Sequence, residues 1–179
     1  MTNTELERCI QIYGKELYSF CRSLTHSVQE ADDLYQDTFL KAMELEQKID
    51  CGQNPKSYLL SVAVRIWKNR RRKYAWRRRI CEERLYAQEV SGQERADKEQ
   101  SPEEWLLARE ETAAVRKAVE RLPERQRVIV LLYYMEELSV TQIAEVVKIP
   151  EGTVKSRLYQ ARKSLQRELE DILYEERFG

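Results

Sequence analysis

Several residue types are scarce in this chain of 179 residues, and each shortage excludes a class of structure or chemistry. Only 5 glycines and 4 prolines accompany a charged fraction of 35%, which argues against β structure and favours helices. The single histidine, His26, excludes a His-rich metal site. No Cys-x-x-Cys pair occurs, so neither a zinc knuckle nor a disulfide framework is indicated by the scattered Cys9, Cys21, Cys51 and Cys81. We expect neither a metal nor a cofactor.

Long apolar runs are also missing, and the N-terminus shows no signal-peptide pattern, so we expect a cytoplasmic protein that does not insert into a membrane. The 31 basic and 31 acidic residues balance, but their distribution is uneven. In residues 68–79, KNRRRKYAWRRR, eight of twelve residues are basic, whereas residues 82–111 are predominantly acidic. One surface can therefore bind phosphates while another meets a basic partner or the chain's own basic surface.

Residues 122–169 predict a helix-turn-helix. Ser139 with Gln142 three positions later forms a capping box that starts a short helix. Pro150 disfavours helical geometry in the residue before it, so the helix ends at the turn 148–150 and a second helix can begin at once. In that second helix, apolar residues at spacings of four, three and four predict one buried stripe, formed by Val154, Leu158, Ala161 and Leu165.

The polar residues of the second helix suit the major groove of DNA. We expect base contacts from Thr153, Ser156 and Gln160. Basic residues on the flanks are expected to contact phosphates, namely Lys155, Arg157, Arg162 and Lys163. The alternative is an amphipathic helix whose basic face is merely solvated.

The same stretch resembles the fourth conserved region of bacterial RNA polymerase sigma factors. The resemblance includes the Leu-Pro opening, an Ile-Ala pair, the run PEGTVKSRL from Pro150 and the later Ala161-Arg162. In that family this region binds the minus-35 promoter element. The resemblance implies that the helix-turn-helix reads promoter DNA.

A second helical unit precedes it. Ser27 with Glu30 forms a capping box, and the pair Asn54-Pro55 predicts the start of another helix after a loop. The first helix carries an acidic face, and its run ADDLYQDTFLKA resembles the second conserved region of sigma factors, which docks on a coiled coil in the largest subunit of RNA polymerase. The resemblance implies that the polymerase contact is made by Asp33, Gln36 and Asp37, with Phe39 and Leu40 packing beside it. Met43 departs from the family pattern, which usually has an aromatic residue there.

The next segment, residues 54–79, mixes aromatic and basic residues. A buried stripe is predicted at Leu59, Val62, Ala63 and Ile66. Cations that follow a backbone and rings that stack on unpaired bases suit single-stranded DNA, and base capture could offset the opening of a short stretch. The segment resembles the sigma region that recognises and opens the minus-10 element, with residues 48–55 as the base-capturing loop. The DNA-facing residues would be Lys56, Tyr58, Arg65, Lys68, Asn69 and Arg72. For Trp67 and Trp76, core packing is as good an interpretation as stacking.

The predicted fold is all-α, with two small helical domains, residues 1–84 and 103–179, joined by a flexible linker, residues 85–102. The linker is polar and lacks apolar periodicity, and Ser101-Pro102-Glu103-Glu104 predicts the start of the next helix. Without further domains the chain is similar to the minimal, extracytoplasmic-function type of sigma factor. Family members of this type bind core RNA polymerase and promoter DNA, and an anti-sigma factor, often membrane-bound, commonly inhibits them.

The sequence therefore predicts a sigma factor that has no catalytic residues and leaves the chemistry to the polymerase. Two alternatives stay open. A dimeric helix-turn-helix regulator would bind a palindromic site without polymerase. An enzyme is suggested by Asp32, Asp33 and Asp37, whose spacing superficially resembles the magnesium-binding motif of isoprenoid synthases, although no second carboxylate cluster is evident.

Overall fold

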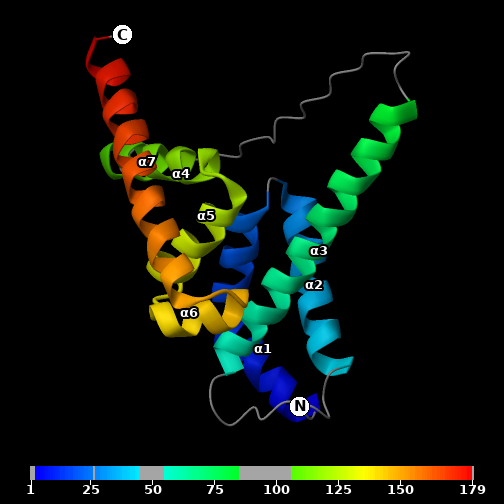
Figure 1. The fold of residues 1–179 in the computed structure, drawn as a ribbon. Coiled ribbons are helices and arrows are strands. Elements are labelled where there is room, and N and C mark those ends of the chain that lie inside the picture. The colour runs from blue at the N-terminus through cyan, green and yellow to red at the C-terminus, as the bar shows by residue number, and fades with distance from the viewer. Residues whose placement is uncertain (1–2, 26, 45–54, 85–105, 179) are drawn as a thin grey trace. The chain divides into compact units, whose positions relative to one another are not determined.

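The computed structural model describes residues 3–25, 27–44, 55–84 and 106–178, and the chain divides into two compact units, residues 1–97 and 98–179. The described residues form helices and turns without any strand, which confirms the all-α prediction (Figure 1). Within these ranges no helix has the length and apolar character needed to span a bilayer. The predicted linker and the predicted helix start at Ser101 lie outside the described residues.

Three helices, α1 (Asn3–Leu24), α2 (Val28–Glu44) and α3 (Pro55–Arg84), pack against one another in the N-terminal unit. The Ser27 hydroxyl accepts a hydrogen bond from the Glu30 backbone N–H at 3.1 Å, which confirms the predicted start of α2. The predicted start of α3 is also confirmed, because its first residue is Pro55. The largest fully buried side chains of this unit are Phe20, Leu24, Leu34, Leu59, Leu60 and Val64.

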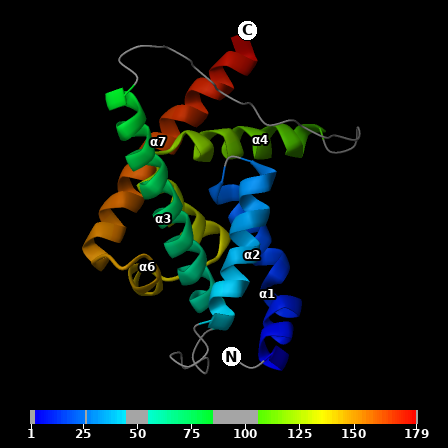
Figure 2. The same ribbon diagram turned by 90° about the vertical axis from the view of Figure 1, so that its right-hand side faces the viewer.

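The predicted buried stripe of α3 is confirmed at Leu59, Val62 and Ala63, whereas Ile66 is half-buried, and the core is wider than predicted. Phe39 of α2 is only 7% exposed and packs edge to face on Tyr35, with 5.0 Å between ring centroids. Trp67 of α3 is 6% exposed and belongs to the core, whereas Trp76 is 64% exposed. The difference arises because α3 runs past the ends of α1 and α2, so its second half has little to pack against (Figure 2).

The C-terminal unit contains α4 (Leu106–Arg121), α5 (Glu124–Val130), the π-helical segment η1 (Leu131–Met135), α6 (Val140–Val147) and α7 (Glu151–Phe178). The capping box at the start of α6 is complete. The Gln142 backbone N–H donates to Ser139 Oγ at 3.2 Å, and the Ser139 backbone N–H donates to Gln142 Oε1 at 2.9 Å. Helix α6 ends at Lys148, which has left-handed backbone angles (φ 57°, ψ 56°). These observations confirm the predicted helix after Ser139, the turn at residues 148–150 and the second helix that follows it.

The sequence does not predict η1. After α5 the helix widens, and the Glu136 backbone N–H bonds to the Leu131 carbonyl oxygen, five residues back, at 3.1 Å. Single π turns of this kind frequently occur at functional sites. Here the widened turn presents Tyr133 and Tyr134 to α7, whose contacts are described below.

Candidate nucleic-acid and polymerase interfaces

The buried stripe of α7 fixes which side of the helix reaches solvent. Val154, Leu158 and Ala161 are at most 4% exposed and pack the helix into its unit. On the opposite side Ser156, Gln160 and Lys163 are exposed. Lys155 and Arg162 are exposed on one flank, and Thr153 and Arg157 are half-buried on the other. The predicted minus-35 residues therefore occupy the solvent-facing side of a single helix and its two flanks.

Ser156 is already committed to one hydrogen bond. Its hydroxyl donates to the Thr153 carbonyl oxygen at 3.1 Å, which is a local bond within the helix. The lone pairs of the Ser156 oxygen are not used by that bond. In this geometry Ser156 can accept a hydrogen bond from an N–H donor on a base edge.

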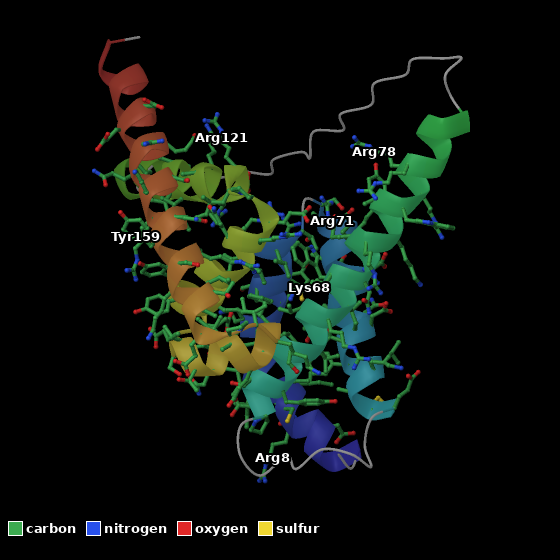
Figure 3. All side chains as sticks on the ribbon, in the orientation of Figure 1. Arg8, Lys68, Arg71, Arg78, Arg121 and Tyr159 are labelled. Atoms are coloured by element: carbon green, nitrogen blue, oxygen red, sulfur yellow. The ribbon has the colours of Figure 1, made fainter. Side chains whose placement is uncertain are left out.

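Tyr159 is a residue of this surface that the sequence reasoning missed. Its side chain is 69% exposed and lies on the outer side of α7, three residues after Ser156 and four before Lys163 (Figure 3). Its helical spacing from the other exposed residues could have predicted its place on this surface. A large aromatic side chain at the centre of a polar face gives this surface an apolar contact as well.

Arg162 differs from the other predicted phosphate-binding residues because it is held within the unit. Its Nε donates to Tyr134 Oη at 2.7 Å, and its guanidinium carbon lies 5.6 Å and 5.7 Å from the ring centroids of Tyr133 and Tyr134. The hydrogen bond that Arg162 donates to Tyr134 raises the pKa of Arg162 above its usual value.

On α3 the predicted minus-10 residues fall into two groups. Arg65, Asn69 and Arg72 are exposed at spacings of four and three, and therefore share one side of the helix. Tyr58 and Lys68 are half-buried. Arg71 and Arg78 are further cations on the same helix, and Figure 3 shows them together with Lys68.

Lys56 is separate from the exposed group. Its ammonium lies 2.7 Å from a carboxylate oxygen of Glu16 in α1, and the Lys56 side chain is only 25% exposed. This ion pair ties the start of α3 to α1. The structure therefore gives Lys56 a packing role that the sequence did not suggest.

The acidic side of α2 presents most of the predicted polymerase-binding residues. Asp33, Gln36, Asp37 and Leu40 are exposed, with Leu40 at 57%. Phe39 is the exception, because it is buried and packs beneath this surface instead of reaching a partner. Asp37 is not isolated, because Arg70 of α3 donates to its carboxylate at 2.6 Å.

A second basic surface lies beside α2, where the second half of α3 leaves an open cleft of about 410 Å³. Trp67 and Tyr74 contribute aromatic side chains to its lining, and Arg70 and Arg77 contribute charge. Tyr74 follows Arg65 by nine residues, so the two side chains leave α3 on roughly opposite sides of the helix axis. The cleft therefore lies on a different side of α3 from Arg65.

Comparison with known proteins assigns both units to one family. Residues 9–77 match the model of Sigma-70 region 2, and residues 112–165 match the model of Sigma-70, region 4. The chain is 26% identical over 170 residues to the ECF RNA polymerase sigma factor SigW of Bacillus subtilis, covering 91% of this chain and 88% of that protein. It is 29% identical over 166 residues to the RNA polymerase sigma-H factor of Pseudomonas aeruginosa, covering 91% and 85% of the two chains.

Solved structures show the same fold. The sigma factor RpoE of Bartonella quintana, in complex with the anti-sigma factor NepR, superposes with a TM-score of 0.71 at 24% identity, covering 93% of this chain and 97% of that one. CnrH, in complex with the cytosolic domain of CnrY, gives a TM-score of 0.65 at 19% identity, covering 95% and 90%. At these sequence identities, both similarities show a shared fold and nothing more.

The chain belongs to the sigma-70 family and is a sigma factor of the extracytoplasmic-function type, which acts in promoter-specific initiation of transcription. Sigma factors are initiation factors that do no catalysis themselves. The match to region 2 as well as region 4 disfavours a free-standing dimeric regulator, for which only the helix-turn-helix would be needed.

Proposed function

We propose that the protein brings core RNA polymerase to promoters by dividing DNA recognition between its two units. The C-terminal unit reads the minus-35 duplex with α7. The observation that carries this step is the row of exposed polar and basic side chains opposite the buried stripe of that helix. Ser156, Tyr159 and Gln160 face the bases, and Lys155, Arg157, Arg162 and Lys163 neutralise phosphates on the flanks.

The N-terminal unit captures the minus-10 element with α3. Arg65, Asn69 and Arg72 lie on one exposed side, and Trp76 follows Arg72 by four residues on the same side with its ring open to solvent. Cations and an exposed ring in one row suit a single strand, because stacking on aromatic rings tolerates any base. The predicted base-capturing loop, residues 48–55, lies largely outside the described residues.

The acidic side of α2 docks on the coiled coil of the largest polymerase subunit. Its exposed carboxylates, Gln36 and Leu40 combine charge with an apolar contact, which is the composition of an interface with a basic partner. All bond-forming chemistry then belongs to the polymerase. The protein works in the cytoplasm, where the polymerase and the promoter are found.

We further propose that an anti-sigma factor controls this protein. The protein shares its fold with RpoE, which was solved in complex with the anti-sigma factor NepR, and with CnrH, which was solved in complex with the cytosolic domain of CnrY. A partner that covers the acidic side of α2 or the basic side of α7 would block polymerase or DNA. Such a partner can be soluble or anchored in the membrane.

Run-off transcription with purified core polymerase tests the proposal. We expect promoter-specific transcripts only when the protein and core enzyme are combined, and weak binding to promoter DNA by the protein alone. Gln36→Ala should weaken binding to core polymerase about tenfold without changing the fold, since loss of an interface anchor costs more than about 1 kcal/mol. Gln11→Ala, at an exposed position of α1, is the matched control. Protection of a palindrome by the protein alone, with no specific transcript, would contradict the proposal.

A further inference from the structure

The contact between η1 and α7 leaves one side of Arg162 open. The Tyr133 and Tyr134 rings pack edge to face, with 4.9 Å between their centroids and an interplanar angle of 76°. The Arg162 guanidinium lies over both rings. Nε of Arg162 is occupied by Tyr134 Oη. In the described part of the chain, the hydrogen-bonding partners of Arg162 are Tyr134 and Tyr133, both on one side of the guanidinium, and the Arg162 side chain is exposed.

The Tyr134 hydroxyl also has hydrogen-bonding capacity left. It accepts the hydrogen bond from Arg162, so its own hydrogen is available to donate. The Tyr134 side chain is 55% exposed although it makes three contacts with its neighbours. Two adjacent groups therefore offer hydrogen-bond donors to the same region of solvent.

The position of Arg162 on α7 decides what these donors meet. Lys155 lies seven residues earlier, so the two cations share one flank of the helix, between the buried stripe and the base-reading side. Groups on the flank of a recognition helix face the sugar-phosphate backbone, whereas groups at its centre face base edges. A backbone phosphate has several acceptor oxygens and a negative charge, which matches a cation flanked by a neutral hydroxyl donor.

We propose that Tyr134 and Arg162 form one composite binding site for a DNA backbone phosphate at the edge of the minus-35 interface. This inference rests on the proposed role of α7 and adds η1 to the DNA-binding surface. Arg162 supplies charge and N–H donors, and Tyr134 supplies an O–H donor. The Tyr133 and Tyr134 rings hold the guanidinium in one orientation before DNA arrives, which lowers the ordering cost of binding.

The test measures dissociation constants of the polymerase holoenzyme for a promoter fragment over a series of salt concentrations. Arg162→Ala should weaken binding about tenfold and lower the salt dependence by about one released counterion. Tyr134→Phe keeps both the ring and the neighbouring charge. It should weaken binding about three- to tenfold with an unchanged salt dependence. The double variant should bind within about twofold of Arg162→Ala, because the two groups act on one phosphate.

Two matched controls separate this site from general effects. Arg116→Ala removes an exposed cation of α4, and Tyr13→Phe removes a hydroxyl of α1, so both should bind promoter DNA like the unchanged protein. The thermal midpoint of each variant shows whether it is folded. Should Tyr134→Phe bind normally, or should the two single effects multiply, the composite site is wrong.

A fall in salt dependence for Tyr134→Phe equal to that of Arg162→Ala would mean that the hydroxyl only holds Arg162, which would also overturn the shared site. If the unchanged holoenzyme forms no promoter-specific complex, both the proposed function and this inference are wrong. If that complex forms and only Tyr134→Phe lacks an effect, this inference fails alone.

Discussion

Arg70 Nη2 of α3 lies 2.6 Å from Asp37 Oδ2 of α2, and the same nitrogen donates to the Asp33 carbonyl oxygen at 3.3 Å. The pair joins the helix proposed to bind polymerase to the helix proposed to open DNA. Asp37 therefore meets any partner with one carboxylate oxygen already engaged. Its orientation depends on a residue outside the predicted polymerase-binding set.

Because Arg70 and Asp37 are 38% and 50% exposed, we expect their ion pair to stabilise the fold only slightly. A double-mutant cycle with Arg70→Ala and Asp37→Asn, followed by urea unfolding, should give a coupling of less than about 1 kcal/mol. The coupling should shrink further in molar salt. A coupling of several kcal/mol would contradict this expectation. In polymerase binding, Asp37→Asn should be the more damaging of the two, since only Asp37 belongs to the predicted polymerase-binding residues.

Gly14 of α1 is buried against the Tyr35 side chain of α2. A Cβ atom at this position would lie 2.9 Å from Tyr35 Oη, whereas a Cβ atom at Gly152 of α7 would meet nothing within 4 Å. Both substitutions to alanine gain helix propensity, so their difference isolates the clash. We expect Gly14→Ala to be less stable than Gly152→Ala by about 1–3 kcal/mol in urea unfolding. Adding Tyr35→Phe should recover much of that difference, and no recovery would show that the hydroxyl is not the obstacle.

Trp67 and Trp76 test the two interpretations of an aromatic residue within a basic run. Trp67→Ala should destabilise the N-terminal unit by about 3–5 kcal/mol, because it empties a buried site. Trp76→Ala should change stability by less than about 0.5 kcal/mol, since that side chain is mostly exposed. Promoter opening, followed by permanganate reactivity of unpaired thymines, should nevertheless fall with Trp76→Ala. Normal opening would remove Trp76 from the proposed DNA-binding side.

The features that the sequence predicted correctly are local. The capping box of Ser139 and Gln142, the turn before Pro150 and the buried stripe of α7 each depend on residue types a few positions apart. Such patterns specify helix starts, ends and faces without knowledge of the rest of the chain. The sequence resemblance then supplied the family, which the region models confirm.

The features that it missed depend on contacts between distant residues. Arg162 meets Tyr134 across 28 positions, Lys56 meets Glu16 across forty, and neither pairing leaves a periodic signal. Phe39 is buried because α2 packs against both α1 and α3, which widens its buried face beyond one stripe. The π turn of η1 is likewise invisible to a helical period. Assignments of single contact residues therefore required the tertiary structure.

Tyr18 links stability to alkaline pH. Its hydroxyl donates to Asp32 Oδ1 at 2.8 Å, and this hydrogen bond to a carboxylate raises the pKa of Tyr18 above 10.0. A pKa that is higher in the folded state gives stability that is complete below about pH 10 and is lost as the pH rises through the folded value. We expect the urea midpoint of the N-terminal unit to fall above pH 10, and to fall less steeply in Tyr18→Phe. An identical slope in both proteins would contradict the link, and Tyr13→Phe is the control.

Ser139 provides the most local test of how the helix-turn-helix is built. Ser139→Ala removes the Oγ acceptor for the Gln142 backbone N–H, so urea unfolding of the C-terminal unit should show a loss of about 0.5–2 kcal/mol. Amide hydrogen exchange at Gln142 should accelerate, because that N–H loses its partner. Ser164→Ala, within α7, has no cap to remove and should be neutral or slightly stabilising. Promoter affinity should fall with Ser139→Ala, but its salt dependence should stay the same because no cation is lost. A changed salt dependence would mean that α6 itself contacts phosphates.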